Sequence, residues 1–362
     1  MTRILGLTMV YWAHRILCLY LSLSLCIRFP STFGYAQLSP SEVSALVSVR
    51  DPEASIDFRN SASHLSRILI PRPSGTENNT IVKNYIVSKL KALNWDVEED
   101  LFTDMTPYGQ KSFTNIIATK NPDALRRVIL AAHFDSKFFA TYPLNQFVGA
   151  TDSAAPCAIL LDVAETLNDL LEQQQEHLNS EAEYEDGDIT LQLVFFDGEE
   201  ALKDWTATDS LYGSRHLAEK WEFEYVNPNS HARRRLIPGH SKLSTIEHLI
   251  LLDLLGSKRP RISSYFLTTG WLFDNIVSIE DRLRMSGAFS FQSSEDDIES
   301  FFVKRVGDLD DASALDLSTL KRWSLIFRIF TAEYLHLKPN VPNRRDPADL
   351  VRAFVFRQKA IN

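Results

Sequence analysis

Acidic and imidazole side chains are concentrated in three short motifs, AAHFDSK (131–137), GATDSAAP (149–156) and LVFFDGEEA (193–201). The last motif contains two adjacent carboxylates, Glu199 and Glu200, and a strand that enters a tight DG turn points neighbouring side chains in different directions. One carboxylate can therefore bind a metal ion while the other transfers protons. Catalytic zinc takes oxygen and nitrogen ligands and keeps one position open for substrate. The three motifs together indicate a zinc-hydrolase active site.

A role follows for three of the acidic residues in these motifs. Asp152 and Glu200 are the predicted metal ligands, and Glu199 is the predicted general acid/base. Each motif follows or flanks an apolar run, which places its polar groups at the sheet edge where open α/β folds bind ligands. The alternative for DGEE alone is a solvated turn that closes a strand. We expect Ser136 and Ser153 to hydrogen-bond to the local turn backbone rather than to act as nucleophiles.

Hydrophobic patterning predicts the elements that position the motifs. The runs VILAA (128–132), LQLVFF (191–196) and HLILL (248–252) are short and apolar, as expected for buried strands. Apolar residues recur at helical spacing in 81–93 and again in 317–337. We therefore predict an α/β fold, a single domain with a central mixed, largely parallel sheet flanked by helices on both faces. The acidic stretch 172–188 is predicted to be a surface loop after a helix.

Length and composition fit one large enzyme domain. The chain has 362 residues, 44% of them hydrophobic, which is ample apolar material for a single core. Its formal net charge of -9 argues against a nucleic-acid partner. We expect a monomer.

Both ends of the chain are predicted to lie outside the catalytic domain. Residues 1–36 have the layout of a secretory signal peptide, with basic residues before the apolar run 16–27 and Ala36 at the expected cleavage site. Cleavage would send the domain through the secretory pathway to the cell exterior. The alternative is an uncleaved anchor that holds it on the Golgi or endoplasmic reticulum membrane. Residues 338–362 are predicted to be a loosely attached tail.

Further motifs extend the pattern, namely RPSGTENN (72–79), DSLYGSRHLA (209–218), LILLDLLGS (249–257) and EYLHL (333–337). With them, the chain resembles the glutaminyl-peptide cyclotransferases, secreted zinc enzymes that share a fold with bacterial zinc aminopeptidases. The resemblance runs from Ser39 to Leu337, and it implies one zinc aminopeptidase-like catalytic domain over residues 37–337. DSLYGSRHLA, with Trp205 upstream, favours the cyclotransferase branch over the peptidase branch.

The resemblance implies an activity and a role for each site residue. The α-amine of an N-terminal glutamine attacks its own side-chain carboxamide, and the products are a pyroglutamyl peptide and ammonia. Peptides and proteins with N-terminal glutamine are the implied partners. This intramolecular acyl transfer needs positioning, oxyanion stabilisation and one proton transfer, but no covalent nucleophile. The implied roles are binding of one Zn2+ by Asp152 and Glu200, proton transfer by Glu199, an acidic pair of Asp253 and Asp296, and a substrate pocket lined by Trp205.

The chain departs from the family pattern after Glu295. Where the family reads DDHxPF, residues 296–301 read DDIESF, so the histidine and the proline are absent. The next strand and the Trp-His-Thr loop that carries the third zinc ligand are also absent, which indicates an internal deletion near 306–310. A lost strand would leave unpaired backbone groups in the sheet, so a mis-spliced coding sequence explains the gap more simply than an evolved deletion. Catalytic zinc generally has three protein ligands, and this chain supplies two of the expected set.

Two other activities stay open besides glutamine cyclisation. One is a zinc aminopeptidase of the same fold, and the other is an inactive peptide-binding pseudoenzyme. His133 is the only histidine inside a motif, and its aminopeptidase counterpart binds a second zinc, so it can support a rearranged site. We nevertheless expect a buried structural histidine at this position, and the same for His216 and His336.

Cysteine and sequon positions add two expectations. Cys18 and Cys26 lie in the predicted leader, which leaves Cys157 alone and excludes an intrachain disulfide in the mature chain. Asn78 begins an NNT sequon, which in a secreted protein predicts a surface glycosylation site.

Overall fold

The structure is a computed structural model, and all its described residues belong to one compact unit that begins at Ala36. Several predicted features lie outside the described residues: the leader and its two cysteines, Asp296, the predicted deletion near 306–310, and most of the C-terminal tail. The described residues are 36–180, 189–225, 241–289 without 259, 261, 263, 265 and 266, and 315–341.

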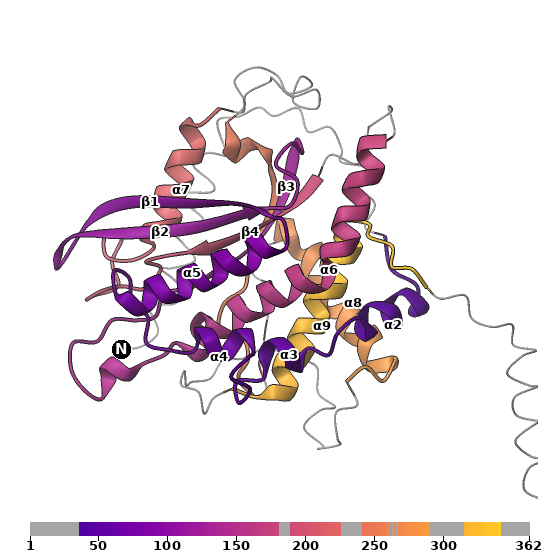
Figure 1. Ribbon diagram of the computed structural model, residues 1–362, viewed down its shortest axis with the longest axis horizontal. Helices are drawn as coiled ribbons and strands as arrows, with labels where there is room; N and C mark the ends of the chain where they lie inside the picture. The colour runs from indigo at the N-terminus through magenta and orange to yellow at the C-terminus, as the bar shows by residue number, and fades with distance from the viewer. Residues whose placement is uncertain are drawn as a thin grey trace, which may run out of the picture. The chain divides into compact units, whose positions relative to one another are not determined.

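The sheet has the strand order β1-β2-β4-β3-β5 (Figure 1). β1 and β2 form an antiparallel hairpin, and β2 also pairs with β4 in antiparallel orientation. β3 pairs with β4 on one side and β5 on the other, both in parallel orientation. The predicted mixed sheet is confirmed, and the three predicted apolar runs form its parallel half. The strands are β1 (Asp96–Thr106), β2 (Gly109–Thr119), β3 (Arg126–His133), β4 (Ile189–Phe196) and β5 (Ile246–Leu251).

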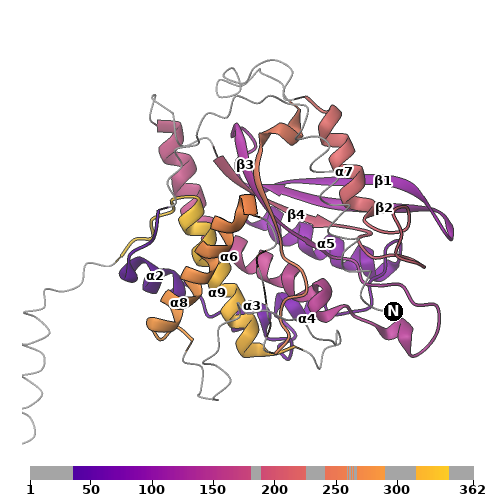
Figure 2. The same ribbon diagram turned by 180° about the vertical axis from the view of Figure 1, so that it is seen from behind.

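Helices cover both faces of the sheet, as predicted. Figures 1 and 2 show α5 (Glu77–Ala92) on one face and α7 (Tyr212–Phe223) on the opposite face. Thr76 caps α5 by accepting a hydrogen bond from the backbone N–H of Asn79. On the other face, Leu217 and Trp221 of α7 join the core cluster formed by residues of β2, β3 and β4. Strands β3 and β4 are almost continuously buried because helices cover them on both sides.

The helix α6 (Ala155–Ser180) is the central helix of the fold and begins directly after the second motif. The segment Leu144–Glu176 is long and apolar enough to cross a membrane, but 83% of its apolar window is buried inside the protein, which is typical of a core helix. The helix continues through Ser180, so the prediction of a surface loop from residue 172 was wrong for its first part, and residues 181–188 lie outside the described part of the chain.

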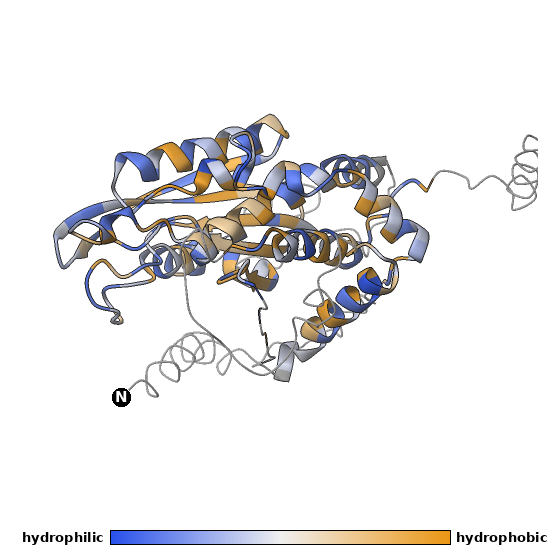
Figure 3. Cartoon of the chain, turned by 90° about the horizontal axis from the view of Figure 1, so that it is seen from below, coloured by the Kyte–Doolittle hydropathy of each residue, from blue (hydrophilic) through white to orange (hydrophobic). Residues whose placement is uncertain are grey.

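The C-terminal helix α9 (Leu317–Tyr334), which the spacing of apolar residues predicted, packs against α6 and α8 (Gly270–Met285). Arg328 of α9 donates two hydrogen bonds to Asp162 of α6, and both side chains are fully buried. In Figure 3 the largely apolar strands at the centre of the sheet lie between helices that carry hydrophilic residues on their outer sides. The remaining short elements are α2 (Pro40–Ser48), α3 (Glu53–Ile56), α4 (His64–Ile68) and single turns at Leu144–Gln146, Ala150–Ala154, Lys242–Thr245 and Leu267–Thr269.

Candidate active site

The three parallel strands deliver the predicted motifs to one edge of the sheet. In the register, His133 at the end of β3 pairs with Phe196 at the end of β4. Leu251 at the end of β5 pairs with Ala131, which places Asp253 just beyond the same edge. The carboxyl ends of parallel strands form the ligand-binding edge of an open α/β sheet. The predicted convergence of the motifs at this edge is therefore present.

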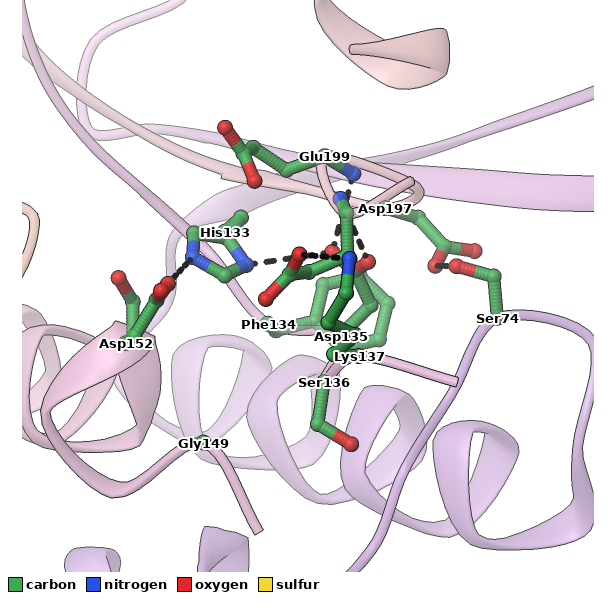
Figure 4. Close-up of polar contacts among 12 residues, drawn as sticks. Ser74, His133, Phe134, Asp135, Ser136, Lys137, Gly149, Asp152, Asp197 and Glu199 are labelled. Carbon is green, nitrogen blue, oxygen red and sulfur yellow. Dashed lines mark hydrogen bonds and ion pairs between the residues drawn. The ribbon is translucent and has the colours of Figure 1, made fainter. Parts of the chain in front are cut away.

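His133 lies at the centre of the cluster, between two carboxylates (Figure 4). Its Nε2 is 2.6 Å from Oδ1 of Asp152 and 3.7 Å from Oδ1 of Asp253, and its Nδ1 is 3.3 Å from Oδ1 of Asp135. Burial alone would lower the pKa of His133, but hydrogen bonding to Asp135 and Asp152 outweighs burial and raises this pKa well above its ordinary value. His133 is buried, as expected, and its ring also contacts the site carboxylates directly, so its role in a rearranged site stays a prediction.

The loop before α6 holds Asp152 against the histidine. Gly149 opens this loop with φ of 50°, in the left-handed region, and a Cβ there would lie 2.3 Å from the carbonyl oxygen of Asp152. Only glycine fits this position. Ser153, in the same loop, donates a hydrogen bond of 2.6 Å from its Oγ to Asp253. This loop therefore carries Asp152 and also holds Asp253 beside His133.

The DGEE turn is held in place by Asp135, the one acidic residue of the first motif. Its buried carboxylate accepts hydrogen bonds from the backbone N–H groups of Glu199 and Glu200, each at 3.2 Å. Glu200 is 7% exposed and Asp197 is 1% exposed, so the alternative of a solvated turn is wrong. Asp135 thereby links the imidazole of His133 to the turn that carries the predicted acid/base.

Burial shifts the ionisation of both glutamates toward neutral pH. It is the largest cause that raises the pKa of Glu199 from 4.5 to about 8 and the pKa of Glu200 to about 7. Burial would also raise the pKa of Asp253, but hydrogen bonding and charge attraction to His133 outweigh it and lower this pKa. The site thus contains a carboxyl group that holds a proton near neutral pH beside another that is ionised.

The structure also shows a supporting residue that the sequence reasoning missed. Asp197, which precedes the turn, is buried, and its carboxylate accepts hydrogen bonds from Ser74 at 2.7 Å, from Asn79 at 3.1 Å and from the backbone N–H of Thr114 at 2.9 Å. Ser74 and Asn79 belong to the RPSGTENN motif, so this segment supports the DGEE turn. The sequence does show a run of small polar residues at the start of a helix, in RPSGTENN. That pattern does not reveal that the distant partner of these residues is Asp197.

The predicted serine contacts were wrong in their partners. Ser136 bonds across 64 residues of sequence, since its Oγ accepts the backbone N–H of Arg72 at 2.9 Å. Ser153 donates to the carboxylate of Asp253 rather than to the turn backbone. Cys157 is a free, buried cysteine whose Sγ donates to the carbonyl of His133 at 3.1 Å. Its neighbours make it a packing residue behind the site.

Three of the gathered side chains are close enough together to hold a cation. Donor atoms of His133, Asp152 and Asp253 all lie within 4.8 Å of one another, and they form the one such group among the described residues. This set includes the predicted ligand Asp152. Glu200, the other predicted ligand, is instead 3.4 Å from the ammonium group of Lys137 through its Oε2. Sequence reasoning placed Asp253 beside Glu199 and left His133 as an option for a rearranged site, so the set combines residues that were considered separately.

Trp205 lies half-buried in the loop that follows the DGEE turn. The carboxylate of Asp209 accepts hydrogen bonds from the backbone N–H groups of Leu202, Lys203 and Asp204 at 2.9–3.0 Å and thereby fixes the start of this loop. Asp209 also accepts the hydroxyl proton of Tyr212 at 2.8 Å. Trp205 therefore follows Glu200 on an ordered segment, and its contact with substrate stays a prediction.

Comparison with known proteins gives a consistent set of similarities. Residues 115–302 match the model of peptidase family M28. The chain is 38% identical over 309 residues to the glutaminyl-peptide cyclotransferase of Drosophila melanogaster, covering 75% of this chain and 79% of the relative. It is 35% identical to the glutaminyl-peptide cyclotransferase of Bos taurus, covering 75% and 81%. Among solved structures, the glutaminyl cyclase of Macrostomum lignano is similar with a TM-score of 0.68 and 32% identity, covering 85% of this chain and 96% of that chain.

Proposed function

Because this chain belongs to peptidase family M28 and to the glutaminyl-peptide cyclotransferases, we propose that it cyclises N-terminal glutamine of peptides and proteins to pyroglutamate with release of ammonia. One observation supports this most: the half-buried acid Glu199 is attached to the same hydrogen-bonded unit as His133, Asp152 and Asp253. The unit combines a possible cation site with a group that carries a proton near neutral pH.

The chemistry of the donor set fits a zinc ion. Imidazole nitrogen and carboxylate oxygen are ordinary zinc ligands, and His133, Asp152 and Asp253 supply one nitrogen and two carboxylates. The second ring nitrogen of His133 is directed at Asp135, the arrangement that orients ligating histidines in zinc sites. These three residues would hold the ion, and Glu200 stays a predicted additional ligand. A bound Zn2+ supplies a Lewis acid for the substrate carboxamide.

Proton transfer is assigned to Glu199. Cyclisation forms a bond between the α-amine nitrogen and the side-chain carboxamide carbon, and it breaks the bond from that carbon to the amide nitrogen. The proton lost by the attacking amine passes to the carboxylate of Glu199, which then delivers it to the departing nitrogen, so that ammonia leaves. Burial raises the pKa of Glu199 to about 8, which suits a group that both accepts and returns a proton near neutral pH.

Asp253 is held in a fixed position beside the proposed acid/base. Asp253 accepts hydrogen bonds from Ser153 Oγ at 2.6 Å and from its neighbour's backbone N–H at 2.9 Å, which fixes its side chain beside His133. Its carboxylate lies close enough to raise the pKa of Glu199. Asp253 therefore favours uptake of the amine proton by the carboxylate of Glu199. The predicted pairing of Asp253 with Asp296 lies outside the described residues.

A peptidase activity is the second candidate, favoured by the position of His133 in the donor set. An enzyme of that kind would activate water and release the first residue of a peptide as a free amino acid. The two candidates are separated by incubating the purified, Zn2+-loaded chain with a glutaminyl peptide and a leucyl peptide of otherwise identical sequence. A cyclotransferase releases ammonia from the first and nothing from the second. Release of free leucine would instead assign the peptidase, and binding of both without product the inactive pseudoenzyme.

We also propose the secretory pathway as the location, on the strength of the predicted leader 1–36. Expression of the full chain in a secreting cell, followed by N-terminal analysis of the protein in the medium, tests this. A terminus at Gln37, cyclised or not, is the expected result, and retention in the membrane fraction with an intact leader would assign the anchor instead.

A further inference from the structure

The segment at Arg72 is tied to both halves of the donor cluster, although none of its atoms is a donor. The side chain of Arg72 is fully buried. Its Nε donates to the carbonyl of Phe134 at 2.5 Å, and its terminal nitrogens donate to the carbonyl of Val148 and, at 3.1 Å, to that of Gly149. Phe134 directly follows His133, and Gly149 begins the loop that carries Asp152. One guanidinium therefore joins the two segments.

The backbone of Arg72 reinforces the same connection. Its N–H donates to Ser136 Oγ at 2.9 Å, and its carbonyl accepts the N–H of Ser136 at 3.3 Å. The carbonyl of Arg72 also accepts a hydrogen bond from Asn79, whose side chain in turn contacts Asp197 below the DGEE turn. The residues after β3 are thus fixed through both the main chain and the side chain of Arg72.

From these contacts we propose that Arg72 is a positioning residue that sets the separation of His133 from Asp152 and thereby the affinity of the donor cluster for a divalent cation. The single turn Ala150–Ala154 departs from helical backbone angles at Asp152 and Ser153, so hydrogen bonds from neighbouring segments help to fix its distance from β3. A planar guanidinium can donate to several carbonyls in one plane, whereas an ammonium group acts as a single point donor. Lysine at this position would keep the charge and lose the bridge.

This inference rests on the metal part of the proposed function and is tested by Zn2+ affinity rather than by turnover. The variants are R72K and, as a matched control, R328K. Arg328 is also fully buried, and it donates hydrogen bonds to Asp162 and to the carbonyl of Arg50. R328K therefore measures how much stability is lost when any buried guanidinium is removed. Zn2+ affinity is measured by competition with a chromophoric chelator, and melting temperature is recorded for each protein.

We expect R72K to bind Zn2+ about 10- to 100-fold more weakly than wild type, the usual effect of losing a group that orients metal ligands, and R328K to stay within about twofold. Both variants should melt at lower temperature. Amide hydrogen exchange should increase at residues 134–136 and 148–153 in R72K and not in R328K. Equal Zn2+ affinities of R72K and wild type, or equal exchange in R72K and R328K, would overturn the proposal.

Failure of the proposed function gives a different pattern. If the wild-type chain releases no ammonia but binds Zn2+, the proposed activity fails. The Zn2+ affinities of wild type, R72K and R328K then still test the role of Arg72. If the wild-type chain binds no Zn2+, the metal assignment fails together with the proposed effect of Arg72 on affinity. The exchange comparison then still decides whether Arg72 fixes the loop.

Discussion

The imidazole Nε2 of His133 lies 2.6 Å from a carboxylate oxygen of Asp152, although the two residues belong to different motifs and different structural elements. His133 ends a buried strand, and Asp152 belongs to a glycine-opened loop that leads into the central helix. In the absence of a metal ion, a protonated imidazole between Asp152 and Asp135 neutralises part of the acidic cluster. A bound divalent cation would neutralise these carboxylates instead. His133 and Asp152 can therefore face each other in the metal-free protein and share a cation in the metal-bound protein.

The donor set predicts that His133 determines metal affinity. Replacing it in H133Q should weaken Zn2+ binding by at least about 100-fold, because the only nitrogen donor of the group is lost. The matched control is H216Q, since His216 stacks on Phe102 at 4.0 Å and pairs with Asp100 away from the donor set. Isothermal titration with Zn2+ measures both. Unchanged affinity in H133Q would show that the ion binds elsewhere.

The proposed proton transfer predicts a selective loss of turnover in E199Q. An amide cannot accept and return the proton, so kcat for a glutaminyl peptide should fall by about 10²- to 10⁴-fold. Zn2+ affinity should stay within about twofold, because Glu199 lies outside the donor group. E219Q, in an exposed position on α7, serves as the control. Near-normal kcat in E199Q would remove Glu199 from the mechanism.

The ionisation of Glu199 also predicts a pH dependence of stability in the metal-free protein. Burial raises its pKa from 4.5 to about 8, so over this interval the folded chain binds a proton that the unfolded chain has released. The free energy of unfolding should therefore decrease as pH rises through this window. In E199Q this contribution is absent. Urea denaturation with excess chelator at several pH values should show a shallower decrease for E199Q than for wild type, and parallel curves would contradict the raised pKa.

Two glycines offer a test of the loop that holds Asp152. Gly149 and Gly109 both have positive φ, but a Cβ at Gly149 would lie 2.3 Å from a backbone oxygen, whereas a Cβ at Gly109 meets nothing within 4 Å. G149A should therefore destabilise the protein more than G109A, by about 1–3 kcal/mol, because the backbone itself must shift. It should also weaken Zn2+ binding, which G109A should not. Denaturation and metal titration of both variants test this, and equal effects would mean that the loop relaxes freely.

Much of the fold could be predicted from local patterns. The apolar runs at 128–132, 191–196 and 248–252 became the three parallel strands, since buried strands need continuous apolar sequence. Helical spacing likewise located α5 and α9. The end of α6 was missed because its last turns are polar, and an acidic, solvated helix surface has the same composition as a loop.

The candidate site was predicted less completely, for a physical reason. The motifs identified Asp152, Glu199 and Glu200, because acidic residues after apolar runs are conspicuous. The contact between Arg72 and Gly149 spans 77 residues, and that between Ser153 and Asp253 spans 100. Such contacts depend on how strands and loops come together in three dimensions, and neither partner carries a local signal for the other.

The most direct test of the central claim is the dependence of ammonia release on zinc. The chain is stripped with a chelator, Zn2+ is added in steps, and ammonia released from a glutaminyl peptide is measured at each step. We expect no release without the ion and a rise that reaches its plateau at about one ion per chain, the number that a single three-donor group holds. Absence of ammonia with the site saturated would contradict the claim.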